Sequence, residues 1–277
     1  MKSIHIKGHR ITATGTYGLL ILGAVLMLFP FYWMVVTSLQ FTHSYFTGLV
    51  PSEVTLYNYL TAFKATSFSL WLVNTMLYCA ITILSNLVLA LLAGYALSRL
   101  RFRGRDRLVF LIVITMLIPG FLVLIPQYLL ILYLGLTNSV LGLSAPYLID
   151  AFNIFLVRQY MLSIPKDLDD AGRVDGCSEF QILTKIIAPL CKPVIMLVTT
   201  FTFLVRWNDF LWPLIVVTNS DRYVLTIGLS SLDTARGASD MGLIMAIATL
   251  CFIGPLLVFV LFQRYLVKGM LLTGIKA

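Results

Sequence analysis

The order of hydrophobic and polar residues along the chain gives six long apolar stretches separated by polar segments. A helix needs about 20 mostly apolar residues to cross roughly 30 Å of hydrocarbon. Stretches of that kind predict membrane-spanning helices near residues 18–38, 71–97, 108–134, 140–160, 193–217 and 242–263. The fourth is the weakest, because Pro146, Asp150 and Asn153 interrupt it. It is retained, because without it the charged segments on either side would lie on opposite faces of the membrane.

The composition excludes an ordinary soluble domain. Hydrophobic residues make up 59% of the 277 positions and charged residues 12%, with a mean hydropathy of +0.93. Soluble domains average roughly 45 to 50% apolar and about 25% charged residues. No period of 20 to 50 residues repeats along the chain, so residues 1–277 are interpreted as a single all-α membrane domain.

The basic residues mark one side of the membrane. Sixteen of the 20 Lys and Arg residues fall in the segments 1–17, 98–107, 158–192 and 264–277, whereas the opposite segments hold only Lys64, Arg222 and Arg236. Basic residues are retained on the cytoplasmic side during insertion, so both termini are expected to be cytoplasmic. This distribution indicates a multi-pass protein of the inner or plasma membrane, in contact with lipid. The net charge of +8 is explained by the basic residues on one side of the membrane and does not indicate a nucleic-acid partner.

The chain lacks the motifs of an enzyme. No Gly-Lys dipeptide occurs, so a phosphate-binding loop is absent, and the longest cytoplasmic segment is too short for a nucleotide-binding domain. His5, His9 and His43 have no HExxH spacing, and the four cysteines form no CxxC pair. We therefore expect no catalytic residue, no metal site and no cofactor in this chain, and any ATP must be hydrolysed by another polypeptide.

The segment 164–193 predicts two short helices joined by a tight turn. Three aspartates suit the positive N-terminal end of a first helix, Gly176 permits the turn, and Ser178 with Gln181 forms a capping-box pattern for a second helix at 179–188. Pro189 and Pro193 are expected to end that helix. Leu168, Ala171, Val174 and, less cleanly, Gly172 form a small apolar face.

Two interpretations of this hairpin remain open on physical grounds. It is either an amphipathic linker on the lipid headgroups or a docking element for a partner protein. Asp167, Asp169 and Asp170 would be repelled by anionic lipid, and the small residues Ala171 and Gly172 permit close approach of another protein.

The hairpin also resembles the EAA motif, E-A-A-x3-G-x9-I-x-L-P, of permease subunits in binding-protein-dependent ABC importers. The motif positions fall on Asp170, Ala171, Gly172, Gly176, Ile186 and Pro189. Asp170 replaces the glutamate, Gly172 the second alanine, and Ala188 stands where leucine is usual. Gly172 costs roughly 0.5 to 1 kcal/mol of local helix stability relative to alanine.

The resemblance covers about nine-tenths of the chain and points to the carbohydrate-uptake branch, in the maltose-permease-like subfamily. The segments that carry it include PFYWMVVTSLQ (30–40), GYALSRLRFRGRD (94–106), IPGFLVLIPQYLLILYLGLTNS (118–139) and WNDFLWPL (207–214). It implies a six-helix type I importer permease, a second permease subunit, a dimer of ATPases that bind ATP and Mg²⁺, and an extracellular solute-binding protein. It also implies contact between the external loop 218–241 and that binding protein, with a solvated loop as the alternative.

By the same resemblance, residues 167–176 are the helix that docks on the ATPase. The residues expected to couple the two proteins are Leu168, Asp170, Ala171, Gly172, Asp175, Gly176 and Pro189.

Polar residues within the spans are candidates for the solute path, since exposure of polar groups to lipid is costly. The candidates are Asn74, Tyr78, Asn86, Asp150, Asn153, Arg206, Trp207, Asn208, Asp209 and Trp212. Of these, the solute path is assigned to Asn74, Tyr78, Asn153, Trp207, Asn208 and Asp209. A Trp-Asn-Asp run offers the aromatic face and hydrogen-bonding groups that a polyol needs. The alternatives are an interfacial anchor for the tryptophan and a pairing of Arg206 with Asp209 or Asp150. Pro119, Pro126 and Pro255 are expected to bend spans three and six.

The sequence therefore indicates the membrane subunit of an ABC importer for a sugar, oligosaccharide or related polyol. A secondary transporter is disfavoured by the shortage of buried ionisable groups. A membrane scaffold that docks a soluble partner without translocation is the other alternative.

Overall fold

The computed structural model describes residues 13–41, 50–51, 53–236 and 239–274. Every regular element in these ranges is a helix, which confirms the predicted all-α class. His5, His9 and His43 lie outside the described residues, as do both ends of the chain. The chain divides into two compact units, residues 1–64 with 232–250 and residues 65–231 with 251–277.

The first unit contains α1 (Ala13–Ser38), most of α2 (Tyr57–Ala65) and parts of α13 (Leu225–Arg236) and α14 (Met241–Gly274). Buried hydrogen bonds tie α1 to α2, because the Asn58 side-chain amide donates to the carbonyls of Ser38 and Gln40 at 2.9 and 2.8 Å. Gly242 lies directly against Gln40 and Asn58, where a β-carbon would clash.

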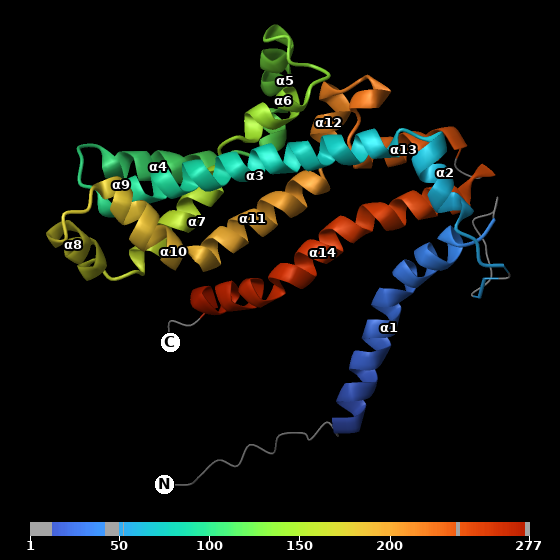
Figure 1. The fold of residues 1–277 in the computed structure, drawn as a ribbon, viewed down its shortest axis with the longest axis horizontal. Helices are drawn as coiled ribbons and strands as arrows, with labels where there is room; N and C mark the ends of the chain where they lie inside the picture. The colour runs from blue at the N-terminus through green and yellow to red at the C-terminus, as the bar shows by residue number, and fades with distance from the viewer. Residues whose placement is uncertain (1–12, 42–49, 52, 237–238, 275–277) are drawn as a thin grey trace. The chain divides into compact units, whose positions relative to one another are not determined.

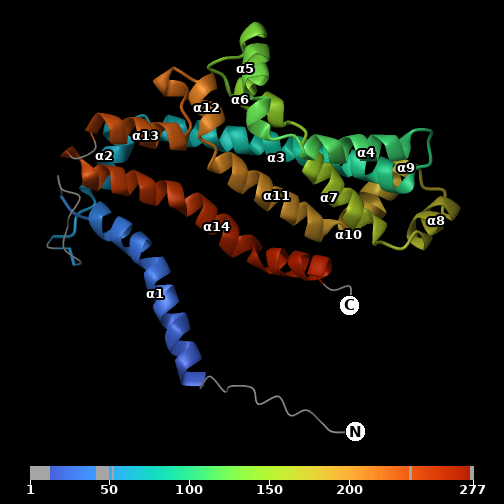
Figure 2. The ribbon, with the colours of Figure 1, turned by 180° about the vertical axis from the view of Figure 1, so that it is seen from behind.

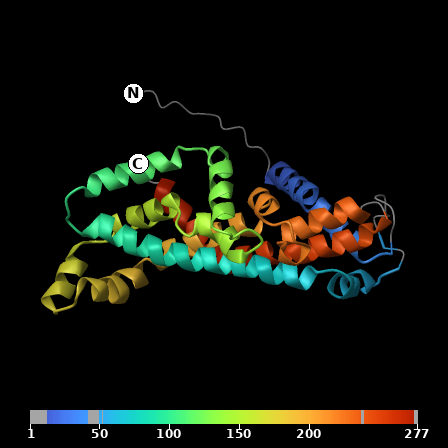
Figure 3. The same cartoon turned by 90° about the horizontal axis from the view of Figure 1, so that it is seen from above.

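The second unit is organised around α3 (Phe68–Arg99), which lies beside α7 (Ala151–Leu162) and α11 (Lys192–Trp207) (Figure 1, Figure 2). Buried Tyr95, Val157, Met161, Ile187 and Val194 belong to one hydrophobic cluster contributed by all three helices and by the hairpin 164–193. The hairpin is therefore packed on the core at one end of α3, where Figure 3 shows it in yellow.

The third predicted span, 108–134, consists of two helices. These are α4 (Arg105–Met116) and α5 (Leu124–Tyr133), separated by an irregular segment that includes the short η1 (Gly120–Leu122). Pro119 lies in this break with an extended backbone, and Pro126 occupies the first turn of α5, where a missing N–H costs no helical hydrogen bond. The expectation that both prolines bend a continuous helix is therefore wrong, whereas Pro255 does lie inside α14.

The fourth and fifth predicted spans are also broken. α6 (Val140–Ser144) and η2 (Ala145–Tyr147) meet α7 at a bend of 48°, and the Asp150 carboxylate caps α7 by accepting from the Phe152 N–H at 2.8 Å. The fifth stretch comprises α11 and α12 (Leu211–Val216), with Asn208–Phe210 between them. Pro146 and Asp150 thus interrupt the fourth stretch as expected, while Asn153 sits within α7.

Three helices among the described residues are long and apolar enough to cross a membrane. The number rises to at most five if two bent pairs each count as one span, namely Val140–Tyr147 with α7 and Glu179–Leu190 with α11, which meet at 77°. The three are contained in α1, α3 and α14, and they coincide with the first, second and sixth predicted spans.

Candidate functional site

The hairpin consists of α8 (Asp167–Val174), a turn, and a second arm that starts at Glu179. Gly176 adopts a φ of +79°, a left-handed conformation that disfavours other residues, so the predicted turn is confirmed. The predicted capping box is also present, since the Ser178 and Gln181 side chains each accept from the other's backbone N–H.

The exposed side of α8 is the one that carries its apolar residues. Leu168 is 39% exposed, Val174 is 88% exposed, and Ala171 is exposed as well. The prediction that Gly172 belongs to this face is wrong, because Gly172 lies on the opposite, buried side, where a β-carbon would come within 2.8 Å of Ile186. The close approach at Gly172 therefore occurs within the hairpin, because residues 169 and 172 share the side of α8 that faces the core.

The second arm comprises α9 (Glu179–Gln181), the π-helical turn η3 (Ile182–Ile187) and α10 (Ala188–Leu190). It continues two residues beyond the predicted end, so Pro189 lies within the arm and does not terminate it. The wider π turn directly precedes this proline, which has no N–H to donate. Pro193 lies in the first turn of α11. Ile182, Leu183 and Ile187 bury this arm in the hydrophobic cluster.

A charged network, absent from the sequence-based prediction, closes the hairpin turn. Arg173 pairs with Asp170 at 2.7 Å and with Glu179 at 2.8 Å, which joins α8 to the second arm. The Tyr95 hydroxyl donates to Glu179 at 2.6 Å and links this network to α3. Asp175 caps the end of α8 and is exposed.

The charged network predicts a pH dependence of the hairpin. Hydrogen bonds from Arg173, and then from Tyr95, hold the pKa of the Glu179 carboxyl below its ordinary value of 4.5. A carboxylate with a lowered pKa contributes stability above that ordinary value, and the contribution is lost as pH falls through the lowered pKa. Hydrogen exchange at residues 173–181, corrected for intrinsic rates, should therefore accelerate on acidification to about pH 3. In Glu179→Gln this additional acceleration should disappear, and its persistence would contradict the assignment.

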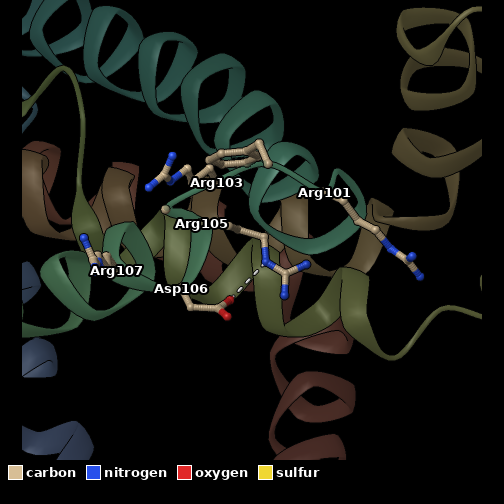
Figure 4. A pocket seen from close by; sticks show the side chains of 7 residues that line it. Arg101, Arg103, Arg105, Asp106 and Arg107 are labelled. Carbon is tan, nitrogen blue, oxygen red and sulfur yellow. Dashed lines mark hydrogen bonds and ion pairs between the residues drawn. The ribbon is translucent and has the colours of Figure 1, made fainter.

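Four arginines lie between the end of α3 and the first turn of α4, in residues 101–107, which we call the arginine loop. Arg101, Arg103, Arg105 and Arg107 line, with Phe102, Gly104 and Asp106, a hollow of about 510 Å³ (Figure 4). Arg105 pairs with the exposed Asp106 at 3.1 Å, while Arg101 and Arg103 point to opposite sides of the loop. Nothing in this arrangement converges on a single ligand, and the loop is best explained as the charged end of a membrane-spanning helix.

A second group of polar side chains lies within the apolar part of the second unit. Arg206 Nη1 lies 3.1 Å from Asp209 Oδ2 and donates to the Tyr78 hydroxyl at 3.0 Å, and that hydroxyl donates to the same carboxylate oxygen at 2.8 Å. The Arg206 guanidinium carbon stands 3.7 Å from the centre of the Tyr147 ring, a close cation–π contact. The predicted pairing partner of Arg206 is thus Asp209 and not Asp150.

A cavity of about 300 Å³ lies beside this group. Asn153 donates to Asn86 Oδ1 at 3.0 Å and to the Thr202 hydroxyl at 3.2 Å, and Arg206 lines the same cavity. Its remaining walls are Tyr147, Asp150, Phe152, Phe201 and Val205. Amide, hydroxyl and aromatic groups therefore face one space, which is the chemistry that recognises a polyol.

Of the six predicted solute-path residues, only Asn153 lines this cavity. Tyr78 and Asp209 bind Arg206 beside it, and the other three lie elsewhere. The Asn74 amide donates to the carbonyls of Asp221 and Tyr223, and the Trp207 indole donates to the Cys251 carbonyl and packs against Gly254. The exposed Asn208 amide, which follows α11, donates to the Leu204 carbonyl of that helix. None of the three lines the cavity.

Sequence reasoning missed Thr202 and Tyr147. Thr202 stands four residues before Arg206 and so shares its side of α11, a spacing that could have identified it. Among the described residues, no group of three His, Cys, Asp or Glu side chains is placed to hold a metal ion.

Comparisons with known proteins match the chain over most of its length. The family model for the binding-protein-dependent transport system inner membrane component matches residues 86–272. The chain is 33% identical over 227 residues to the arabinooligosaccharides transport system permease protein AraQ of Halalkalibacterium halodurans, which covers 82% of this chain and 81% of AraQ. It is 32% identical over 256 residues to the lactose transport system permease protein LacG of Rhizobium radiobacter, with 92% and 93% covered.

The fold is also similar to that of solved structures. One of them is a chain of a bacterial ABC transporter involved in the import of the acidic polysaccharide alginate, with a TM-score of 0.83 and 25% identity. The likeness covers 95% of this chain and 99% of that one.

Proposed function

The chain belongs to the family of binding-protein-dependent transport system inner membrane components, and from this premise we propose that it is one of two transmembrane subunits of an ABC importer for a sugar, oligosaccharide or related polyol. The relatives named above carry saccharides of different sizes, so the proposal is limited to this solute class. An extracellular binding protein delivers the solute, and two ATPase subunits that bind ATP and Mg²⁺ supply the energy.

The observation that carries the proposal is the exposed apolar face of α8. Leu168, Ala171 and Val174 are turned outward, while the second arm of the same hairpin is packed into the core. An exposed apolar surface next to charged groups favours a protein interface over open solvent. This face, with Asp170, Asp175 and the Gly176 turn, docks on an ATPase subunit. Gly172 packs inside the hairpin, whereas Pro189 is exposed and lies within its second arm.

The orientation follows from the arginine loop and the hairpin. Both lie at the same end of α3, and their basic residues support a cytoplasmic location for that end. Six crossings follow if the broken stretches α4 with α5, α6 with α7, and α11 with α12 each cross once, and both termini are then cytoplasmic.

Docking couples ATP binding to the membrane helices through movement of the hairpin as a rigid body. For ATP to shift the equilibrium, it must bind more tightly to the outward-facing state of the complex than to the inward-facing state. The solute then passes beside the cavity formed by Asn86, Asn153 and Thr202.

The test is solute-stimulated ATP hydrolysis by the complete complex in lipid vesicles. The proposal expects hydrolysis to rise when the solute-loaded binding protein is added. A scaffold would leave ATP hydrolysis indifferent to solute. Transport by the purified chain alone, driven by an ion gradient, would instead support a secondary transporter.

The cavity makes a separate prediction. Thr202→Val removes a hydroxyl that faces the cavity while it keeps the side-chain shape, and Asn153 retains its bond to Asn86. Loss of one hydrogen bond to a polyol costs about 0.5 to 1.5 kcal/mol, so the KM for transport should rise by about two- to twelvefold. Transport assays in vesicles over a range of solute concentrations measure this change.

Thr200→Val is the matched control for Thr202→Val. Thr200 also lies on α11, but its hydroxyl donates to Met196 of its own helix and does not line the cavity. Equal KM values in the two variants would contradict the prediction that this cavity lies beside the solute path.

A further inference from the structure

The two arms of the hairpin are held in place by different forces. The second arm buries Ile182, Leu183 and Ile187, each at most 5% exposed, in the hydrophobic cluster. α8 buries no large apolar side chain, because its two buried residues are Asp169 and Gly172. Hydrophobic burial therefore fixes the second arm but leaves the position of α8 to other contacts.

The most deeply buried ion pair of α8 joins it to the last residue of α3. Arg99 Nε lies 3.1 Å from Asp169 Oδ2, and the two side chains are only 1% and 3% exposed. Arg99 Nη2 also donates to the Ile164 carbonyl at 2.9 Å, just before α8. A single arginine thus holds both the segment that enters α8 and its first turn.

This ion pair is costly in the present arrangement. Arg99 Nε and Nη1 and Asp169 Oδ1 are buried without a hydrogen bond to any described residue, so the 3.1 Å contact is an ion pair without a hydrogen bond. Burial raises the pKa of the Asp169 carboxyl despite the nearby arginine. Buried ion pairs with incomplete hydrogen bonding add little net stability, and their better-attested use is to fix geometry. The pair is therefore a poor stabiliser but an effective positional constraint.

We infer that Arg99 and Asp169 are positioning residues, which attach α8 to the end of α3 so that movement of the docked helix passes directly into α3. The inference rests on the proposed function, since it assigns a role within the coupling that the hairpin performs. The second arm, packed on α7 and α11, provides a separate connection that remains when the ion pair is removed.

Hydrogen exchange of the full-length chain, in the assembled complex in lipid nanodiscs, tests the attachment. In Asp169→Asn and in Arg99→Gln, exchange over residues 167–176 should rise by about tenfold, while exchange over 182–190 stays unchanged. In the double variant, exchange over residues 167–176 should be no faster than in either single variant, because no uncompensated charge is left. Unchanged exchange over 167–176 in both single variants, or equal acceleration in both arms, would overturn the inference.

Arg158→Gln is the matched control. The Arg158 side chain of α7 donates to the Leu97 carbonyl at 3.2 Å, so it is also an arginine bonded to the end of α3. This hydrogen bond does not involve the hairpin. The Arg158→Gln substitution should leave exchange over residues 167–176 unchanged. If exchange there accelerates as much as in Arg99→Gln, the assignment of a specific role to the Arg99–Asp169 ion pair is contradicted.

The functional readout is the amount of solute transported per ATP hydrolysed. This ratio should fall severalfold in Asp169→Asn, while the ATPase remains associated and Arg158→Gln behaves as the unmodified protein. Faster exchange in α8 with an unchanged ratio would contradict the inference and leave the proposed function intact. Failure of the unmodified complex to show solute-stimulated hydrolysis would instead contradict the proposed function.

Discussion

Val174→Asp should abolish association with the ATPase while the membrane helices stay folded. Val174 is 88% exposed, so the substitution should change the free energy of unfolding by no more than about 0.5 kcal/mol. In the docked state the same change removes apolar contact and places an unpaired charge in the interface. A cost of about 2 to 4 kcal/mol there weakens binding by about 30- to 1,000-fold. Titration of the ATPase onto the chain in nanodiscs measures the loss.

Phe102→Asp is the control for that experiment. Phe102 is another exposed apolar residue, 42% exposed, in the arginine loop at the same end of α3. It also receives an acidic group, but it lies outside the hairpin and should retain ATPase binding. Equal affinities of Val174→Asp and the unmodified chain would contradict docking through α8.

Arg206→Met should have the largest effect on stability. The substitution leaves the Asp209 carboxylate, whose side chain is only 14% exposed, without its paired cation. It also removes the guanidinium that donates to the Tyr78 hydroxyl. Loss of one partner of a buried ion pair costs about 3 to 5 kcal/mol. Thermal unfolding in detergent should therefore show a large decrease in Tm.

Two further variants distinguish the ion pair from a general effect of losing an arginine. Arg206→Met combined with Asp209→Leu should recover part of the stability, because no buried charge is then unpaired. Arg222→Met changes an exposed arginine in η4 (Ser220–Arg222) and should leave Tm nearly unchanged. A double variant less stable than Arg206→Met would contradict this account of the pair.

Local features of the hairpin were predictable from the sequence because each depends on neighbouring residues. The capping box joins positions three residues apart, and Gly176 follows from the conformational freedom of glycine alone. The position of Gly172 was not predictable, because the side of α8 that faces the core depends on Ile186 in the second arm.

Contacts between distant residues account for most of what sequence reasoning missed. Arg99 and Asp169 are 70 positions apart and Tyr78 and Asp209 are 131 apart, so only the packing of α3 brings these groups together. The helix breaks were missed for another reason. An apolar stretch satisfies the length expected of a span whether or not it is one helix, and around Pro119 the chain bends between two helices.

A photo-crosslinker at position 174 provides the most direct test of the central claim, that the exposed face of α8 docks on a separate ATPase. In the complex within lipid vesicles, we expect illumination to join this chain to the ATPase subunit, with the same crosslinker at position 102 as the low-yield reference. Capture of lipid alone from position 174, or reaction of that position only with reagents added outside the cell, would contradict the account.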